Sequence, residues 1–385
     1  MITILERTQL ESMSHGKAEF IFYPSRFKDN IDEFKKAFSK KFGDKYRIGY
    51  SVKTNRDEYV LEEVLKNGLM AEIVSRDEYN LVKKIGFTDD NIIYNGVMPD
   101  LYNKFNVAQA GGIVNIENLF EFKQIAEKAA STKTCIEIGV RINLNFSNYQ
   151  SRFGFVFCDD EYKEMKRILL SNKYVSINCV HCHVHGGRQT EYFAKRTKYM
   201  SCVAKDLSAR YIDLGGNLYG NVDDGLRCQF NEELPTASDY AETISKALAD
   251  VYPRNAPSII IETGTALIGN AVDMVCRVTS VRKREGKYIA TCNGSSYDFG
   301  FFKGSVKKVP MDIIHVSDGV FVDAIEIFGY ACTEDDVVNS SYTGFIAEGD
   351  ILIFKNLGAY AQSLSGNFIC NALRISVKNI LGDIH

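Results

Sequence analysis

The chain lacks an excess of charge of either sign, and it lacks any long apolar run. Its 385 residues include 46 basic and 49 acidic side chains, which give a formal net charge of −3. This balance provides no broad positive field, so nucleic acid is not expected as a partner. No apolar run approaches the roughly 18 residues that span a bilayer. Residues 1–20 contain glutamates and no continuous apolar core, so we do not expect them to act as a secretory signal.

The ten cysteines lack the paired spacing of a disulfide framework, and low-complexity tracts and short repeats are also absent. A chain of this length builds its own core, so we expect reduced thiols and a cytoplasmic location. Apolar residues make up 45% of the chain and charged residues 25%, which is typical of a soluble globular enzyme. The length suits one large domain and a smaller one.

Between residues 25 and 265, strand-like and helix-like segments alternate without interruption. Helical spacing is seen in Ile31, Phe34 and Phe38, and Ser75 with Glu78 predicts a capping box at another helix start. Eight segments read as strands: 47–52, 70–74, 91–95, 112–116, 135–143, 175–183, 210–214 and 258–262. Such alternation predicts a parallel sheet, and eight repeats predict its closure into a (β/α)8 TIM barrel.

Residues 266–385 show a different pattern, in which helical periodicity is scarce. Segments 271–281 and 287–292 flank a turn-like Glu285-Gly286 and read as a β-hairpin, and 349–354 is a further strand-like run. We expect a C-terminal β-rich domain, a sandwich or barrel-like sheet. Residues 1–24 are assigned to it as well, because 18–23 is strand-like and precedes the barrel.

Reactive side chains and glycines follow four of the barrel strands, where the chemistry of this architecture lies. Lys53 ends the first strand, His183 the sixth and Glu262 the eighth, and Gly215-Gly216 follows the seventh. A lysine held on a fixed element can bond covalently to a carbonyl cofactor. Glycines after the seventh strand can turn backbone N–H groups toward a phosphate. A buried carboxylate can hold a protonated pyridine nitrogen.

Each of these residues also has an ordinary structural interpretation. A lysine after a strand is usually solvated, a glycine pair usually makes a tight turn, and Glu262 would suit an ion pair at the barrel rim. Histidines 181, 183 and 185 share one face of a strand by their spacing of two, which would suit a metal ion. No carboxylate or second cysteine pair accompanies them in the sequence. The alternative is that His183 packs on a flat cofactor ring, and we expect no metal.

The motifs resemble those of the fold-type III, alanine racemase-like enzymes that depend on pyridoxal 5′-phosphate (PLP), in the ornithine/diaminopimelate decarboxylase branch. The resemblance covers nearly the whole chain in the right order. In the barrel it rests on Tyr50-Ser51-Val52-Lys53-Thr54-Asn55, Ala71-Glu72-Ile73-Val74-Ser75, Arg152-Phe153-Gly154, His181-Cys182-His183, Gly215-Gly216-Asn217 and Glu262-Thr263-Gly264-Thr265. The resemblance implies that Lys53 binds PLP, that His183 stacks on its ring and that Glu262 holds its pyridine nitrogen.

The resemblance also implies roles for residues around these motifs. Cofactor contacts are expected from Gly215, Gly216, Asn217, Gly264, Thr265 and Tyr360, and substrate contacts from Arg152, Thr333, Asp336 and Tyr360. In the β-rich domain, Gly329-Tyr330-Ala331-Cys332 and Gly358-Ala359-Tyr360 carry the likeness. Cys332 is expected to return a proton to the substrate carbon in the partner's site. The expected partner is therefore a second copy of the chain, in a homodimer with shared active sites.

Departures from the family pattern bear on cofactor affinity and on the substrate. Thr265 stands where the family has an arginine that helps hold the phosphate, and Asn217 stands for a glycine. His185-Gly186 interrupts the usual Gly-Ser contact. Thr333 follows the cysteine where the diamine-forming and diaminopimelate enzymes place an acid, and Asn293 replaces a frequent aspartate. The Cys332-Thr333 pair is similar to members that act on siderophore or antibiotic intermediates.

The sequence therefore predicts PLP-dependent decarboxylation of an amino acid or an amino-acid-derived biosynthetic intermediate. Ornithine, lysine and diaminopimelate are disfavoured as substrates by the departures. Two alternatives remain. A PLP-dependent racemase would need bases on both faces of the reacting carbon. A catalytically silent regulatory homologue would have lost key residues, whereas Lys53, Glu262 and Cys332 are all present.

Overall fold

The computed structural model describes residues 18–144, 151–366, 368–371, 373 and 375–376. The chain divides into two compact units. One, the barrel unit, comprises residues 28–220 and 234–266; the other, the β-rich unit, comprises the described residues up to 27, 221–233 and those from 267 onward. The predicted boundary between the domains lies after residue 265, and the prediction includes residues 221–233 in the barrel.

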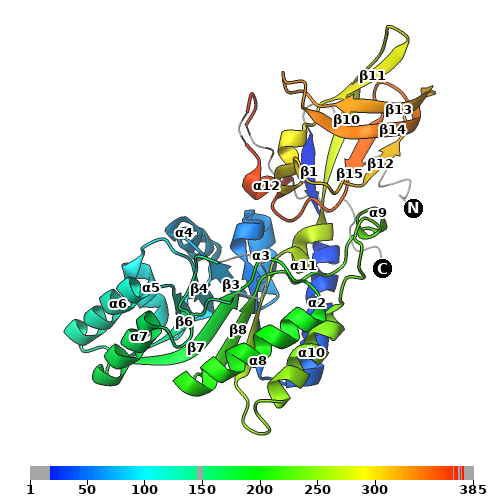
Figure 1. Ribbon diagram of the computed structural model, residues 1–385. Helices are drawn as coiled ribbons and strands as arrows, with labels where there is room; N and C mark the ends of the chain where they lie inside the picture. Colours follow the sequence, from blue (N-terminus) through cyan, green and yellow to red (C-terminus); the bar gives the residue numbers. More distant parts are fainter. Residues whose placement is uncertain (1–17, 145–150, 367, 372, 374, 377–385) are drawn as a thin grey trace. The chain divides into compact units, whose positions relative to one another are not determined.

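The barrel unit contains a closed sheet of eight parallel strands (Figure 1), which confirms the predicted fold. Each strand pairs with its neighbours in chain order, and β9 pairs with β2 to close the ring. The strands are β2 (Tyr46–Ser51), β3 (Met70–Ile73), β4 (Ile92–Tyr94), β5 (Ile113–Ile116), β6 (Ile136–Arg141), β7 (Val175–His183), β8 (Tyr211–Gly215) and β9 (Ser258–Thr263).

Helices follow the strands and lie outside them (Figure 1). Their apolar stripes face the sheet; in the first of them, Phe34 and Phe38 are fully buried. The helices are α2 (Pro24–Phe42), α3 (Glu58–Lys66), α4 (Arg76–Ile85), α5 (Leu101–Gln109), α6 (Leu119–Thr132), α7 (Asp160–Ser171), α8 (Thr190–Leu207), α10 (Ala237–Ala249) and α11 (Thr265–Ile268), with 3-10 turns η1 (Val52–Thr54) and η2 (Asp89–Asn91).

The start of α4 differs in detail from the predicted capping box. The Ser75 hydroxyl accepts from the Glu78 N–H at 3.2 Å, as expected. The Glu78 carboxylate, however, accepts from the Val74 N–H at 2.8 Å and not from that of Ser75. A reciprocal box forms instead at α10, between Thr236 and Asp239.

The barrel interior is layered because side chains alternate along each strand with a period of two. One buried apolar cluster is formed by Met70, Ile93, Ile113, Cys179 and Ile260, with Tyr211 packed against it. The residue two positions later in each of these strands or strand ends is polar and buried: Glu72, Asn95, Asn115, His181, Glu262 and Asp213. The strands thus place an apolar floor beneath a ring of polar groups at their carboxyl ends.

The β-rich unit holds an eight-stranded sheet. Its path is β12-β15-β10-β11-β13-β14, and β1 pairs with β10 and β16. Its elements are β1 (Glu19–Phe22), α9 (Asp224–Arg227), η3 (Gly269–Ala271), β10 (Val272–Arg284), β11 (Lys287–Cys292), η4 (Ser296–Phe302), β12 (Met311–Ile314), β13 (Val320–Phe328), β14 (Val337–Ile346), β15 (Ile351–Phe354), α12 (Ala361–Leu364) and β16 (Ile375–Ser376).

The predicted hairpin is confirmed: β10 and β11 pair antiparallel around Glu285 and Gly286, which both have positive φ, as a tight two-residue turn requires. The early strand β1 also joins this sheet, antiparallel to β10. Strands β12, β13 and β14 were missed. The β13–β14 ladder shifts register three times, which breaks the alternation that identifies a strand in sequence.

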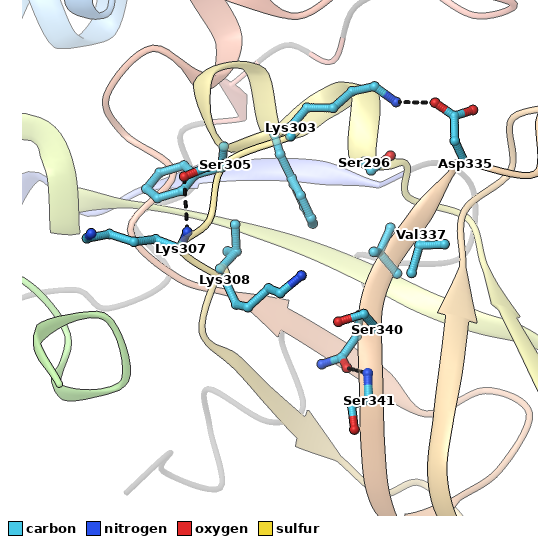
Figure 2. Close-up of a pocket in the computed structure, with 15 residues that line it drawn as sticks. Ser296, Lys303, Ser305, Lys307, Lys308, Asp335, Val337, Ser340 and Ser341 are labelled. Atoms are coloured by element: carbon cyan, nitrogen blue, oxygen red, sulfur yellow. Dashed lines mark hydrogen bonds and ion pairs between the residues drawn. The ribbon is translucent and has the colours of Figure 1, made fainter. Parts of the chain in front are cut away.

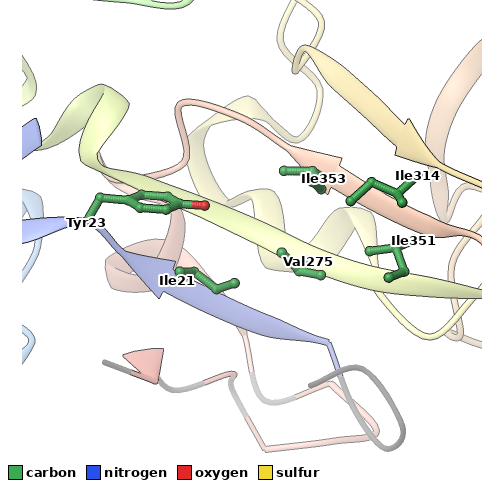
Figure 3. Close-up of a cluster of buried hydrophobic side chains, with 6 residues drawn as sticks. All are labelled: Ile21, Tyr23, Val275, Ile314, Ile351 and Ile353. Atoms are coloured by element: carbon green, nitrogen blue, oxygen red, sulfur yellow. The ribbon is translucent and has the colours of Figure 1, made fainter. Parts of the chain in front are cut away.

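One buried apolar cluster of the β-rich unit lies on one face of this sheet (Figure 3). It is formed by buried apolar side chains from β1, β10, β12 and β15: Ile21, Tyr23, Val275, Ile314, Ile351 and Ile353. Strands far apart in sequence meet here, so residues near the chain start complete a sheet formed mainly after residue 271. In the described part of the chain, no helix has the length and apolar character that crossing a membrane requires.

Candidate active site

Lys53 lies at the carboxyl end of β2, on the short turn η1. Its Nζ donates to Oε2 of Glu72 at 2.6 Å, and 27% of its side chain is exposed while that of Glu72 is fully buried. Burial would raise the pKa of the Glu72 carboxyl. The Lys53 ammonium and hydrogen bonds from Lys53, Ser51 and Asn95 outweigh it, so the pKa is lowered. Glu72 therefore anchors the lysine amine in a fixed position at the rim.

Asn95 connects this pair to the opposite side of the ring. Its Nδ2 donates to Oε1 of Glu72 at 3.0 Å and makes a short hydrogen bond to Oε1 of Glu262. Its Oδ1 accepts from Nδ2 of Asn115 at 2.8 Å. The Asn95 side chain thus uses its two N–H donors and its oxygen acceptor to fix the positions of two buried carboxyl groups and one amide.

Glu262, at the end of β9, contacts two histidines from β7. Its Oε2 lies 3.0 Å from Nδ1 of His183, and its Oε1 lies 3.4 Å from Nδ1 of His181. Burial and the nearby Asp213 carboxyl raise the pKa of Glu262 to about 8. Burial and the Lys53 charge lower the pKa of His183 well below its usual value. At a pH below the raised pKa of Glu262, the Glu262 carboxyl is neutral. A cationic partner would favour the ionised form of this carboxyl.

Asp213 adds a further buried carboxyl on β8, and burial raises its pKa well above the usual range. Its Oδ2 lies 3.2 Å from Nδ1 of His181. Within the described residues, His181, Asp213 and Glu262 form the group whose ligand atoms lie within 4.8 Å of one another. The three-histidine cluster considered above does not form, since β7 ends at His183 and His185 lies exposed beyond it.

The loop after β8 packs closely against Glu262 and His183. A Cβ on Gly215 would meet Oε2 of Glu262 at 2.0 Å and Nδ1 of His183 at 2.6 Å. Gly216 has φ +88°, and a Cβ there would meet the Val184 carbonyl oxygen at 2.3 Å. Asn217 follows with φ +59°, and its amide donates to the carbonyls of Val184 and Gly186. Only glycine fits the first two positions.

The turn after β9 packs against the Lys53 turn. A Cβ on Gly264 would meet Oγ1 of Thr54 at 2.3 Å, so this glycine permits a close approach of the two loops. Thr265 begins α11 and is half-buried. These residues fit PLP, since one rim combines a lysine amine, a buried acid for a ring nitrogen and glycine loops for a phosphate.

Arg152 does not join the polar ring by any observed contact. It is exposed, and its guanidinium lies over the Phe153 ring at 4.2 Å from the centroid. Arg141 lies over the same ring at 4.4 Å, and it pairs with Glu117 at 3.1 Å. The substrate contact predicted for Arg152 remains a prediction.

In the β-rich unit, the loop before β14 carries Cys332 and Thr333. Cys332 is exposed, and the Thr333 hydroxyl lies 3.5 Å from the Tyr297 hydroxyl. Asp336 was predicted to contact substrate, but it is buried and accepts hydrogen bonds from the hydroxyls of Ser295 and Ser296 and from backbone N–H groups of Ser296 and Ala331. These bonds hold the Cys332 loop in place, and the substrate contact of Asp336 stays a prediction.

A cavity of about 390 Å³ lies on the same side of the β-rich unit, between the 296–309 segment and the start of β14 (Figure 2). Lys303 and Asp335 form an ion pair at its edge, 3.3 Å apart. The Lys303 ammonium also lies over the Tyr297 ring, 3.3 Å from its centroid. Tyr360 has φ +60° before α12, and its ring lies 6.4 Å from that of Phe301.

Sequence reasoning found Lys53, His183, Gly215 and Glu262, which lie on one rim, but it gave no role to Glu72, Asn95, Asn115, Asp213 or Arg196. The sequence contains a pattern that could have identified the four residues on strands or strand ends. Each is a polar residue two positions after an apolar one that faces the barrel interior. Arg196 lies on a helix, where its complete burial has no counterpart in the sequence pattern.

Comparison with known proteins agrees with this geometry. Residues 28–269 match the family described as pyridoxal-dependent decarboxylase, pyridoxal binding domain. The diaminopimelate decarboxylase of Haemophilus influenzae is 24% identical over 354 residues, which are 86% of this chain and 81% of that protein. The diaminopimelate decarboxylase of Vibrio cholerae is 25% identical over 354 residues, with the same coverage of both chains.

Solved structures share the fold. The diaminopimelate decarboxylase of M. jannaschii, solved in complex with L-lysine, superposes with a TM-score of 0.82 at 18% identity, over 97% of this chain and 90% of that one. The arginine decarboxylase of Paramecium bursaria Chlorella virus, bound to agmatine, gives 0.78 at 20% identity, over 97% and 99%. The family match covers well over half of this chain. The chain therefore belongs to the pyridoxal-dependent decarboxylases, carboxy-lyases that use PLP as their cofactor.

Proposed function

We propose that Lys53, Glu262, His183 and Cys332 carry out the decarboxylation of an amino-acid-derived intermediate whose distal end is not a simple amine. The observation that carries the site assignment is the continuous polar connection from Lys53 through Glu72 and Asn95 to Glu262. It fixes an amine and an acid on one rim of the barrel. When bound, PLP supplies the electron sink for loss of CO2.

Residues of the chain bind the cofactor, orient it and transfer protons. Lys53 would hold the cofactor through Nζ, and its side chain is 27% exposed, which leaves the amine accessible. Glu262 holds a proton on the pyridine nitrogen, and its burial strengthens that contact. His183 packs on the ring face and orients it. Cys332, in the partner's site, donates a proton from Sγ to the substrate Cα after CO2 has left.

The surroundings of Cys332 support a substrate with a polar or carboxylated distal end. Thr333 offers a neutral hydroxyl, and the Tyr297 hydroxyl lies beside it. The nearby acid Asp335 already pairs with Lys303. At Thr333 itself a distal ammonium group would meet a neutral hydroxyl, with the exposed Glu334 next along the chain, whereas a carboxylate could accept from the Thr333 and Tyr297 hydroxyls. This chemistry fits carboxylate-rich biosynthetic intermediates of the siderophore or antibiotic kind.

Diaminopimelate is the second candidate, because the relatives described above carry that name. A panel assay separates the two. Release of CO2 is measured from diaminopimelate, lysine, ornithine, arginine and carboxylate-rich diamino acids, with Lys53→Ala as the blank. We expect the last class to give the highest kcat/KM. A preference for diaminopimelate would show that the chain is a diaminopimelate decarboxylase. Turnover of lysine or ornithine alone would contradict the interpretation that the neutral Thr333 disfavours substrates with a distal amine.

Two further reactions are less well supported. A racemase would exchange the Cα proton without releasing CO2, and a silent homologue would do neither. The family match and the retention of Lys53, Glu262 and Cys332 favour decarboxylation over both.

A further inference from the structure

Arg196, on α8, is a completely buried arginine beneath two loops of the barrel rim. Its Nη1 donates to the carbonyl oxygens of Gly215 at 2.9 Å and Gly216 at 3.1 Å. Its Nη2 donates to the carbonyl of Gly187 at 3.3 Å. The guanidinium also stacks on Phe193, 3.7 Å from the ring centroid. One side chain therefore ties the loop after β7 to the loop after β8.

This cation has no anionic partner among the described residues. No carboxylate lies within ion-pair distance of it, and its Nε has no hydrogen-bond acceptor. Burial lowers the pKa of Arg196 to about 10, which still leaves the group charged at neutral pH. Buried charges in proteins are normally paired, because an unpaired charge is costly to remove from water. An anion that belongs to this position is therefore expected nearby.

The peptide geometry indicates where that anion lies. In a trans peptide the C=O and N–H point in opposite directions, and the described chain contains no cis peptide. Because the carbonyls of Gly215 and Gly216 point at Arg196, the N–H groups of Gly216 and Asn217 point away from it. Neither N–H has an acceptor within the part of the chain that the structure describes. Successive backbone N–H groups in a turn can form a concave anion-binding site, and Gly216 and Asn217 lie in such a turn, with φ of +88° and +59°.

We propose that Arg196 is a positioning residue for the PLP phosphate, which it serves from behind the Gly215–Asn217 loop. Its charge polarises the two peptide groups whose N–H groups face the phosphate, and its three hydrogen bonds hold both loops in place. Arg196 thereby replaces the arginine that the resembled family carries at the position of Thr265. The inference rests on the cofactor alone and is independent of the substrate proposed above.

The test compares PLP with pyridoxal, which lacks the phosphate, by titrating each into apoprotein and following absorbance. For Arg196→Met, of similar length and without charge, we expect the Kd for PLP to rise about 10- to 100-fold. The Kd for pyridoxal should change by less than about threefold. Equal weakening of both ligands, or no weakening of PLP, would overturn the proposal.

Two further variants separate charge from packing. Arg47→Met is the matched control, because Arg47 also stacks on an aromatic ring, that of Tyr211, but lies at the start of β2. It should leave both Kd values unchanged. Adding Thr265→Arg to Arg196→Met should recover at least about a third of the lost binding free energy, measured again without substrate. A double variant no better than Arg196→Met would show that Arg196 does not act through its charge.

If Arg196→Met does not fold, the phosphate site can still be tested on the unaltered protein. Inorganic phosphate is the probe, and the thermal midpoint of the apoprotein is followed with phosphate and with chloride at equal ionic strength. The proposal predicts a higher midpoint in phosphate only, and competition between phosphate and PLP but not between phosphate and pyridoxal. Equal midpoints in the two salts would contradict a phosphate site at this loop.

Discussion

Asn95 donates both of its amide hydrogens to carboxyl groups, one to Glu72 and one to Glu262. Glu72 in turn binds the Lys53 amine, and Glu262 contacts His183. The two ends of the proposed PLP site are therefore held by one buried amide, and their spacing depends on it.

The first prediction concerns this amide. Asn95→Leu removes both donors and leaves two buried carboxyl groups facing each other, so the free energy of unfolding should fall by roughly 2–3 kcal/mol. Urea unfolding of the apoprotein measures it. Asn91→Leu is the control, since Asn91 is half-buried and its side-chain amide donates to the Leu69 carbonyl, and it should cost about 1 kcal/mol or less. Equal losses in the two variants would contradict a special role for Asn95.

The second prediction uses the raised pKa of Glu262, about 8 against a usual 4.5. Between these values the folded apoprotein keeps a proton that the unfolded chain has lost, so stability falls as pH rises, by up to about 1.4 kcal/mol per pH unit. Glu262→Gln removes this dependence. Urea unfolding from pH 5.5 to 8 should give a shallower slope in the variant. A remainder is expected from Asp213, Glu78 and Asp298, because burial also raises the pKa values of these carboxyl groups. Parallel slopes would show that Glu262 is ionised in the folded apoprotein.

The third prediction concerns the absence of a side chain at Gly215. An alanine Cβ would lie 2.0 Å from Oε2 of Glu262, so Gly215→Ala must displace the acid and His183. We expect a loss of about 1–3 kcal/mol in PLP binding free energy, roughly ten- to hundredfold in Kd. Gly366→Ala is the control, since its Cβ would meet nothing closer than 4.0 Å. Unchanged PLP binding in Gly215→Ala would contradict the placement of the cofactor above Glu262.

The fourth prediction tests the shared active site of a homodimer. Lys53→Ala and Cys332→Ala variants are each expected to be inactive. In a random mixture half of the dimers are mixed, and each mixed dimer has one of its two sites intact, so about a quarter of the activity should return. CO2 release before and after mixing measures it, with sedimentation to report the dimer. No recovery in a sample that exchanges subunits would place Lys53 and Cys332 in the same chain's site, or exclude Cys332 from it.

Much of the barrel could be predicted because its signals are local. The ends of β2, β7 and β9 are marked by apolar runs, so Lys53, His183 and Glu262 could be assigned to one rim. The Asn95 contacts could not be predicted, because they depend on how the registers of β3, β4 and β9 align across the ring. Arg196 was missed since it lies on a helix and its acceptors are carbonyls of distant loops.

Less of the β-rich unit than of the barrel could be predicted from the sequence. Its hairpin could be predicted from the turn residues, whereas β13 and β14 contain bulges that disturb the alternation on which strand prediction relies. Asp336 is predicted to contact substrate from the motif around Cys332, and its four hydrogen bonds to the neighbouring loop could not be predicted from that motif. A motif names the residues of a loop, but it does not show which of them is buried and which is exposed.

The central claim is that Lys53 is the amine that binds PLP. The most direct measurement is to load the protein with PLP, reduce it with borohydride and locate the modified lysine by peptide mass mapping, with Lys53→Ala in parallel. The account predicts one pyridoxyl group on the peptide that contains Lys53, and none in the variant. Modification at another lysine, or equal modification of the variant, would contradict it.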